Sequence, residues 1–279
     1  MPLSGRETDG GLLCYAAMLR RILGEPAFRC LHVARDPASE VLRSRLDRLV
    51  AGALPGVPCD LAAGDPLDSI LAAAAEFDAD LVLLGHASQR RRRSLARRLA
   101  AKAPCSVWMA PAGSPPAIRR ILVPIDFSRR SADTVAAACA LAEAAGLDEA
   151  LALHVHFNDA LVTFDEFDEI LAEDRDRAFC LFIAPIDLRG VWLKPLFVDS
   201  ARVADAIVRA AQEHDCDLIV MGTRGRSPSA AVLLGSETEQ CIMTTGVPLL
   251  AVKHFGARLS LVDALRDERL RRRGDARFT

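Results

Sequence analysis

The chain has 279 residues, of which 51% are apolar and 26% are charged, and its formal net charge is −2 at pH 7. This length is enough for two domains of about 140 residues, each with a core of its own. The nearly balanced charge excludes a protein whose whole surface binds nucleic acid or an anionic membrane. We therefore expect neither of these partners.

The eight cysteines occur singly, without a CxxC pair or a zinc-like spacing, and most of them lie in apolar runs. Reduced cysteines in such runs behave as small apolar residues, which favours a reducing cytoplasm. Residues 1–10 contain no apolar segment of a signal peptide, and no apolar run approaches the length of a membrane span. The sequence therefore predicts a cytoplasmic protein.

The first half of the chain begins with Met1–Gly11, which contains too few apolar residues for a buried strand. A helix is predicted next, at about 12–23. We therefore expect the first sheet to lack its first strand. Further along, Asp80–Gly85 predicts a buried strand, and Val107–Met109 predicts the last strand of this half.

A Pro/Gly/Ser-rich stretch, Ala110–Pro116, separates two patterned halves and is the expected domain boundary. In the second half, short apolar strands alternate with helices, which predicts an α/β fold with a mostly parallel sheet covered on both faces. The predicted strands are Ile121–Ile125, Ala150–Val155, Val191–Val198, Leu218–Met221 and Leu249–Val252, and the predicted helices are Ser131–Ala145, about 163–184, Ala201–Glu213 and about 235–245.

The first half repeats the plan of the second. Asp80–Gly85 matches Asp217–Gly222 at an offset of 137 residues, and Ala103–Met109 matches Thr245–Ala251 at an offset of 142 residues. The first half has thus lost five residues between these two segments. The repeat predicts two related lobes, at 1–112 and 117–255.

A tail is expected at 256–279. Its spaced apolar residues fit a short amphipathic helix that docks on the protein's own body or on a partner, and arginines follow near its end.

The second half contains a glycine-rich loop between a strand and a helix. Gly222 and Gly225 directly follow the predicted strand, and Gly235 and Ser236 stand at the start of the next predicted helix. Glycines allow a tight turn with exposed amides, and Ser236 suits an N-cap at a helix start that offers free N–H groups. This arrangement suits polyphosphate. Alternatively, the glycines serve only as turns and Ser236 as a plain helix cap.

These residues make the chain resemble the nucleotide-binding form of the universal stress protein family. The family pattern Gly-x2-Gly-x9-Gly-Ser/Thr is met with every spacing correct, and Val123–Asp126 resembles the family's first strand. The resemblance implies two Rossmann-like, three-layer lobes of the adenine nucleotide alpha hydrolase-like type. It also implies an internal pseudo-dimer in which the last strands, about Val107–Met109 and Leu249–Val252, pair across a dyad.

The resemblance further implies that the second lobe binds ATP or a related adenine nucleotide, with or without Mg²⁺. In the family, the acidic residue matched by Asp126 helps to hold adenosine, and the position of Val155 contacts adenine through its backbone. Arg224 or Arg226 would add positive charge near the phosphates. The expected nucleotide-binding residues are Pro124, Ile125, Asp126, Val155, Met221, Gly222, Arg224, Gly225, Gly235, Ser236 and Glu237. Asp126 could equally be a helix N-cap or a salt-bridge partner.

The first lobe is expected not to bind nucleotide. Arg93 and Ser94 fall on Gly235 and Ser236, so an arginine side chain would stand where phosphate must sit. The missing first strand would also remove any counterpart of Asp126. The arginine run 90–93 is more typical of a solvated helix face than of an anion or nucleic-acid site.

Other candidate sites are weaker. His154 and His156 lie two apart on a strand and share a face, but no third metal ligand is evident, which favours a structural role. No catalytic elbow, Walker lysine or general base is evident. The leading hypothesis is a stress-response or signalling protein that binds nucleotide and an unknown protein partner. The alternatives are a nucleotide-free interaction scaffold and a slow ATPase, and a homodimer of the whole chain stays open.

Overall fold

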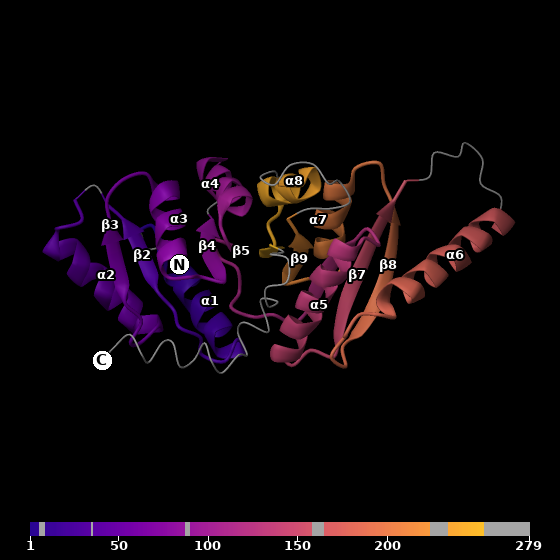
Figure 1. Ribbon diagram of the computed structural model, residues 1–279, viewed down its shortest axis with the longest axis horizontal. Coiled ribbons are helices and arrows are strands. Elements are labelled where there is room, and N and C mark those ends of the chain that lie inside the picture. Colours follow the sequence, from indigo (N-terminus) through magenta and orange to yellow (C-terminus); the bar gives the residue numbers. More distant parts are fainter. Residues whose placement is uncertain (6–8, 35, 87–89, 158–164, 224–233, 254–279) are drawn as a thin grey trace.

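The computed structural model describes residues 1–5, 9–34, 36–86, 90–157, 165–223 and 234–253. Two lobes lie side by side along the long axis of the molecule (Figure 1). Lobe one contains strands β1 to β5 and lobe two contains strands β6 to β10. The predicted tail at 256–279, together with Arg224, Gly225 and Arg226 of the loop, lies outside the described residues.

Strands and helices alternate along both lobes. The elements of lobe one are β1 (Pro2–Leu3), α1 (Asp9–Ile22), β2 (Cys30–Val33), α2 (Glu40–Ala53), β3 (Cys59–Ala62), α3 (Pro66–Glu76), β4 (Leu81–His86), α4 (Arg90–Lys102) and β5 (Ser106–Pro111). The elements of lobe two are β6 (Ile121–Ile125), α5 (Arg129–Ala144), β7 (Glu149–His156), α6 (Asp165–Ile183), β8 (Trp192–Asp199), α7 (Val203–Glu213), β9 (Leu218–Gly222), α8 (Ser236–Thr244) and β10 (Leu249–Val252).

The helices cover both faces of the strands, as the alternating pattern predicts. One apolar core contains buried side chains from α1, α2, α5 and α6, and a second contains buried side chains from α3, α4, α7 and α8. The strands contribute to both cores because their side chains alternate between the two faces. Each lobe therefore has the three-layer arrangement of helices, sheet and helices.

The last strands of the two lobes pair, which confirms the expected pseudo-dimer. Seven strands form one sheet in the order β4-β5-β10-β9-β6-β7-β8, and β5 and β10 are antiparallel within it. Trp108 pairs directly with Leu250, its own counterpart at the offset of 142 residues. A residue that faces its own counterpart marks the pseudo-dyad, and Trp108 there is 1% exposed.

Helices also meet across this dyad. α4 packs against α8, as Figure 1 shows near the centre of the molecule. Arg97 donates to Glu239 Oε1 at 2.7 Å, and these two residues are again counterparts at the offset of 142. Because both side chains are about 40% exposed, this ion pair marks the dyad without contributing much stability.

The expectation that lobe one lacks its first strand is wrong. Pro2 and Leu3 form a two-residue strand that pairs in parallel with β2, with Leu3 buried. The sequence pattern missed this strand because two residues cannot show an apolar period, and its pairing depends on a neighbour 29 positions away. The strand pairs with β2 alone, so β1, β2 and β3 form a separate three-stranded sheet.

Among the described residues, no helix combines the length and the apolar content needed to cross a bilayer.

Candidate functional site

The site predicted in lobe two lies where the order of its strands reverses. From β6 the chain continues to β7 and β8 on one side and then returns to β9 and β10 on the other. β6 and β9 pair only through Ile121 and Leu122, although β9 continues alongside β10 as far as Gly222. Pro124 has no N–H with which to continue a ladder toward β9. Parallel sheets bind ligands at such switch points, outside the carboxyl ends of the strands.

Two hydrogen bonds fix the start of α8 to the end of β9. The Gly235 N–H donates to Thr223 O at 2.8 Å, and Thr238 Oγ1 donates to Gly222 O at 2.8 Å. Thr223 and Thr238 are both buried. The two ends of the predicted phosphate loop, Gly222 and Gly235, are therefore held together, and the positive end of the α8 dipole lies at the carboxyl edge of the sheet.

The prediction that Ser236 is the N-cap of this helix is wrong. The N-cap is Gly235, with φ −62° and ψ 142°, and Ser236 is the first helical residue. The Ser236 hydroxyl donates to Glu237 Oε1 at 3.3 Å. Since Gly235 has no side chain with which to cap, no side-chain cap bond is made at this helix start. The first amides of α8 are thus not covered by a capping side chain.

Asp126 follows β6 and organises the start of α5. Its Oδ1 accepts hydrogen bonds from Ser128 N at 3.0 Å and from Ser131 Oγ, and the same hydroxyl accepts from Asp126 N at 3.0 Å. The N-cap of α5 is Ser128, whose Oγ accepts from Ser131 N at 3.2 Å. Asp126 is therefore neither the N-cap nor isolated: a serine five residues along positions its carboxylate.

Aromatic rings surround the end of β7 beside Asp126. Phe127 adopts a left-handed backbone conformation with φ 60°, and its ring lies 4.4 Å from that of His154, centroid to centroid. His154 Nδ1 bonds to Ile125 O at 3.0 Å, which ties the end of β7 to the end of β6. Val155 is half-buried and follows directly. The family pattern does not include Phe127 or Ser131, and their local sequence resembles that of any residues at the start of a helix.

Glu237 lies at this edge, but its carboxylate is used within the protein. Glu237 Oε2 accepts from the backbone N–H of Ala204 at 3.0 Å, in the first turn of α7. The N-cap residue of α7, Arg202, makes no side-chain cap bond of its own. Glu237 therefore caps α7 from a neighbouring helix, a role that the loop motif does not reveal.

Lys253, the residue after β10, connects this edge of lobe two to lobe one. The Lys253 N–H donates to Ser106 Oγ at 3.1 Å, and its ammonium group donates to Ala101 O at 3.4 Å and to Ala103 O. A cation on the last carbonyls of a helix is favourable because that end carries the negative end of the dipole. Lys253 thus holds the end of α4 beside β10, whose Val252 O accepts a hydrogen bond from Thr223 N.

The histidines of β7 do not form a metal cluster. No group of three possible ligands occurs within the described parts of the chain. The His154 and His156 rings stack at 6.3 Å, and His156 Nε2 lies 2.7 Å from Arg175 Nη1. A guanidinium group only donates, so Nε2 is the acceptor and the ring is neutral. Burial lowers the pKa of His156, and the nearby Arg175 lowers it further.

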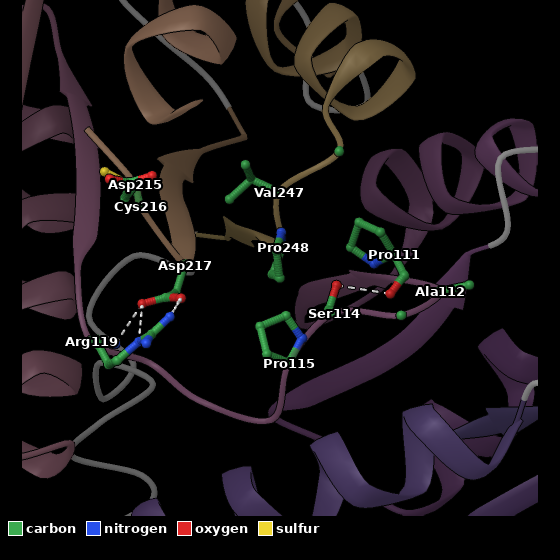
Figure 2. A pocket seen from close by; sticks show the side chains of 12 residues that line it. Pro111, Ala112, Ser114, Pro115, Arg119, Asp215, Cys216, Asp217, Val247 and Pro248 are labelled. Atoms are coloured by element: carbon green, nitrogen blue, oxygen red, sulfur yellow. Dashed lines mark hydrogen bonds and ion pairs between the residues drawn. The ribbon is translucent and has the colours of Figure 1, made fainter. Parts of the chain in front are cut away.

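A cavity of about 340 Å³ lies at the opposite edge of the sheet, beside the linker between the lobes (Figure 2). Its wall includes Pro111, Pro248 and Asp217, and the Asp217 carboxylate accepts from Arg119 Nη2 at 3.1 Å and Nε at 3.4 Å. None of the expected nucleotide-binding residues lines it. This cavity belongs to the attachment of the linker to lobe two.

Comparisons with known proteins agree with this architecture. The model of the universal stress protein family matches the chain twice, at residues 18–111 and 117–253. A curated universal stress protein of Thermus aquaticus, described as lying in the QAH/OAS sulfhydrylase 3′ region, is 31% identical over 138 residues. That match covers 48% of this chain and 98% of the relative.

Two solved structures share the arrangement of both lobes. One is a putative universal stress protein from Pseudomonas aeruginosa UCBPP-PA14, with a TM-score of 0.64 and 18% identity, which covers 90% of this chain and 89% of the other. The other is a universal stress protein from Archaeoglobus fulgidus, with a TM-score of 0.60 and 18% identity over 90% and 96% of the two chains. With the family model matched over both halves, the chain belongs to the universal stress protein family.

Proposed function

We propose that this protein binds ATP or a related adenine nucleotide in lobe two and acts in stress response or signalling in the cytoplasm. The observation that carries the proposal is the junction at the switch point, where Gly222 and Gly235 are held together at the start of α8. Backbone amides at a helix start favour an anion, because they are unsatisfied donors at the positive end of the helix dipole.

In the proposed complex, the phosphates lie against the helix-start amide of Ser236, since the Gly235 N–H is already bonded to Thr223 O. The adenosine half lies toward Asp126 and Val155. Ser131 and Ser128 orient the Asp126 carboxylate for this role. Arg224 and Gly225 complete the phosphate side in the proposal, and a Mg²⁺ ion would accompany a polyphosphate. The geometry assigns no general base, so we propose nucleotide binding rather than turnover as the functional event.

A nucleotide-free scaffold is the second candidate, and Glu237 favours it. This carboxylate lies one residue from Ser236, where its negative charge opposes a bound phosphate. Its two hydrogen bonds, from Ala204 N and Ser236 Oγ, already hold it in place without a ligand. On this alternative the lobes present a surface to a protein partner, and the loop is only a connection.

A thermal-shift titration distinguishes the two candidates. ATP, ADP, AMP and GTP would each be added with Mg²⁺ to the full chain and to Gly235→Arg, which places a side chain at the start of α8. A ligand at 100 times its dissociation constant stabilises the folded state by about 2.7 kcal/mol. We expect a rise in melting temperature with adenine nucleotides that is lost in Gly235→Arg.

The matched control is Gly246→Arg. Gly246 is an exposed glycine at the opposite edge of lobe two, and a Cβ there would meet no atom within 4 Å. This variant carries the same added charge and should keep the nucleotide response. If no nucleotide shifts the melting temperature of the unmodified chain, the scaffold candidate replaces the proposal.

A further inference from the structure

The internal repeat places the carboxyl edge of lobe one in register with the candidate site of lobe two. Leu3 pairs with His32 as Ile125 pairs with His154, so the offset between the lobes is 122 residues in both strands. In each lobe the histidine Nδ1 bonds to the carbonyl of its strand partner at 3.0 Å. Lobe one therefore retains the strand-end architecture of lobe two.

The expectation that lobe one has no counterpart of Asp126 is wrong, and the actual counterpart is a reversed pair. At the same offset, Ser4 stands at the position of Asp126, and Asp9 at that of Ser131. Ser4 Oγ donates to Asp9 Oδ1 at 2.7 Å, and Gly5 N donates to Asp9 Oδ2 at 2.7 Å. Both lobes thus hold a serine–aspartate pair, but in lobe one the carboxylate belongs to the first turn of α1 and is 5% exposed.

These residues line a cavity of about 210 Å³. Ser4, Asp9 and His32 form its polar side, at the ends of β1 and β2. Its other walls are apolar side chains from β2, α3, β4 and α4, among them Val33, Ile70, Leu84, Leu95 and Ala96. A wholly apolar cavity of about 150 Å³ holds a benzene ring, so the volume of this one is enough for a small bicyclic molecule.

The phosphate side of this cavity has been replaced by apolar groups. At the offset of 142, Leu95 stands at the position of Glu237 and Ala96 at that of Thr238. α4 begins at Arg90, so the positions that match Gly235 and Ser236 lie inside the helix rather than at its start. Their amides are used within the helix and are not available to an anion.

An apolar side chain, Leu12, also packs on Gly85, which lines the cavity. A Cβ at Gly85 would lie only 2.8 Å from Leu12 Cδ2, so the leucine packs directly on the glycine that matches Gly222 of lobe two. Glycine is needed at this position for that close approach. The strand end that precedes the predicted phosphate loop in lobe two therefore has, in lobe one, a counterpart that contacts a hydrocarbon side chain.

The His32 side chain in the cavity wall can accept a hydrogen bond from a ligand. His32 Nδ1 must carry the proton, because its partner is a carbonyl oxygen, and in the neutral ring this leaves Nε2 as an acceptor. Nε2 makes no hydrogen bond to any residue that the structure describes. The ring is held in place by Gly5, whose φ is 72° and where a Cβ would lie 2.9 Å from His32 Cε1.

From this we infer that lobe one is a second binding site, for a small, uncharged, mainly aromatic or aliphatic molecule that donates one N–H or O–H to His32. The site selects against phosphorylated ligands, because it offers them no free helix amides and no cation among the described lining residues. The inference concerns lobe one alone and does not depend on nucleotide binding by lobe two.

The test is methyl-detected NMR of the full chain with indole as the probe. Indole is a neutral bicycle with one N–H donor, and 1-methylindole has the same body without the donor. We expect indole to shift the methyl signals of Val33, Ile70, Leu84 and Leu95. We expect 1-methylindole to bind at least about fivefold more weakly, which is the value of one hydrogen bond, and AMP to leave these methyl signals unchanged.

Two variants locate the site, and one serves as the control. Leu95→Glu restores the residue that lobe two has at this position, and Ala96→Leu reduces the volume of the cavity. Each should reduce the indole response by at least about tenfold while the methyl signals of lobe two stay in place, which shows that the chain is folded. Gly235→Arg, at the site proposed for nucleotide, should leave indole binding unchanged.

Three results would overturn the inference. The first is the absence of any indole-dependent shift in the methyl signals of Val33, Ile70, Leu84 and Leu95. The second is equal affinity for indole and 1-methylindole, and the third is AMP binding in lobe one at least as tightly as indole. The last of these would make lobe one a second nucleotide site. Loss of nucleotide binding in lobe two would leave the inference for lobe one unaffected.

Discussion

The capping of α7 by Glu237 can be tested by Glu237→Ala. The structure gives α7 no side-chain cap at its own N-cap residue, Arg202, and the Glu237 carboxylate accepts the Ala204 N–H at 3.0 Å instead. Losing a capping acceptor costs about 1 kcal/mol, within a range of 0.5–2 kcal/mol. A difference of about 1 kcal/mol makes the open state of the first turn of α7 about fivefold more populated in the variant than in the unmodified protein.

Amide hydrogen exchange at Ala204 measures this opening directly. We expect exchange about fivefold faster in Glu237→Ala, with the amides near the centre of α7 much less affected, since capping acts on the first turn. The matched control is Glu237→Gln, which keeps an oxygen acceptor and removes the charge. It should retain most of the protection. Unchanged exchange at Ala204 in Glu237→Ala, together with weaker ATP binding, would refute the capping role and make Glu237 a ligand-binding residue.

Three further predictions follow from the same contacts. Ser131→Ala removes the hydroxyl that orients Asp126 and should weaken ATP binding about fivefold in calorimetry, with little change in fold; unchanged affinity would remove Ser131 from the site. Trp108→Ala empties a position that is 1% exposed on the pseudo-dyad and should cost about 3–5 kcal/mol in urea unfolding, and a loss under 1 kcal/mol would contradict the role of this seam. Burial and Arg175 lower the pKa of His156 in the folded state, so its contribution to stability is complete above pH 6.5, its ordinary pKa, and is lost as the pH falls below that value. His156→Gln should therefore flatten the dependence of the unfolding free energy on pH between 7 and 5. An unchanged slope would contradict this role of His156.

Much of the fold could be predicted because the apolar runs and the turn-forming residues between them mark the same element boundaries. Strands such as Ile121–Ile125 and Leu249–Val252 were predicted at the residues where they occur, since they are short apolar runs bounded by turns. The pairing of the last strands across a dyad was expected from the family resemblance. Residues with an internal counterpart at a constant offset, such as Trp108 and Leu250, were therefore placed correctly in space.

The missed features depend on contacts that no local pattern encodes. β1 is defined by its pairing with β2 rather than by its own composition. The reversed pair of Ser4 and Asp9 becomes visible only when the register of β1 and β2 gives the offset of 122 residues. The capping role of Glu237 depends on a partner 33 positions away in the sequence. Each of these features depends on contacts between residues far apart in the sequence, which can be recognised only once the structure gives the pairing.

Nucleotide binding by lobe two is tested most directly by the number of ATP sites per chain, measured by isothermal titration calorimetry on the full protein. Lobe two has a helix start at its switch point, whereas the matching positions in lobe one lie inside α4. Nucleotide binding by lobe two alone predicts one ATP per chain, lost in Gly235→Arg and kept in Gly246→Arg. A stoichiometry of two, or one site that persists in Gly235→Arg, would contradict it.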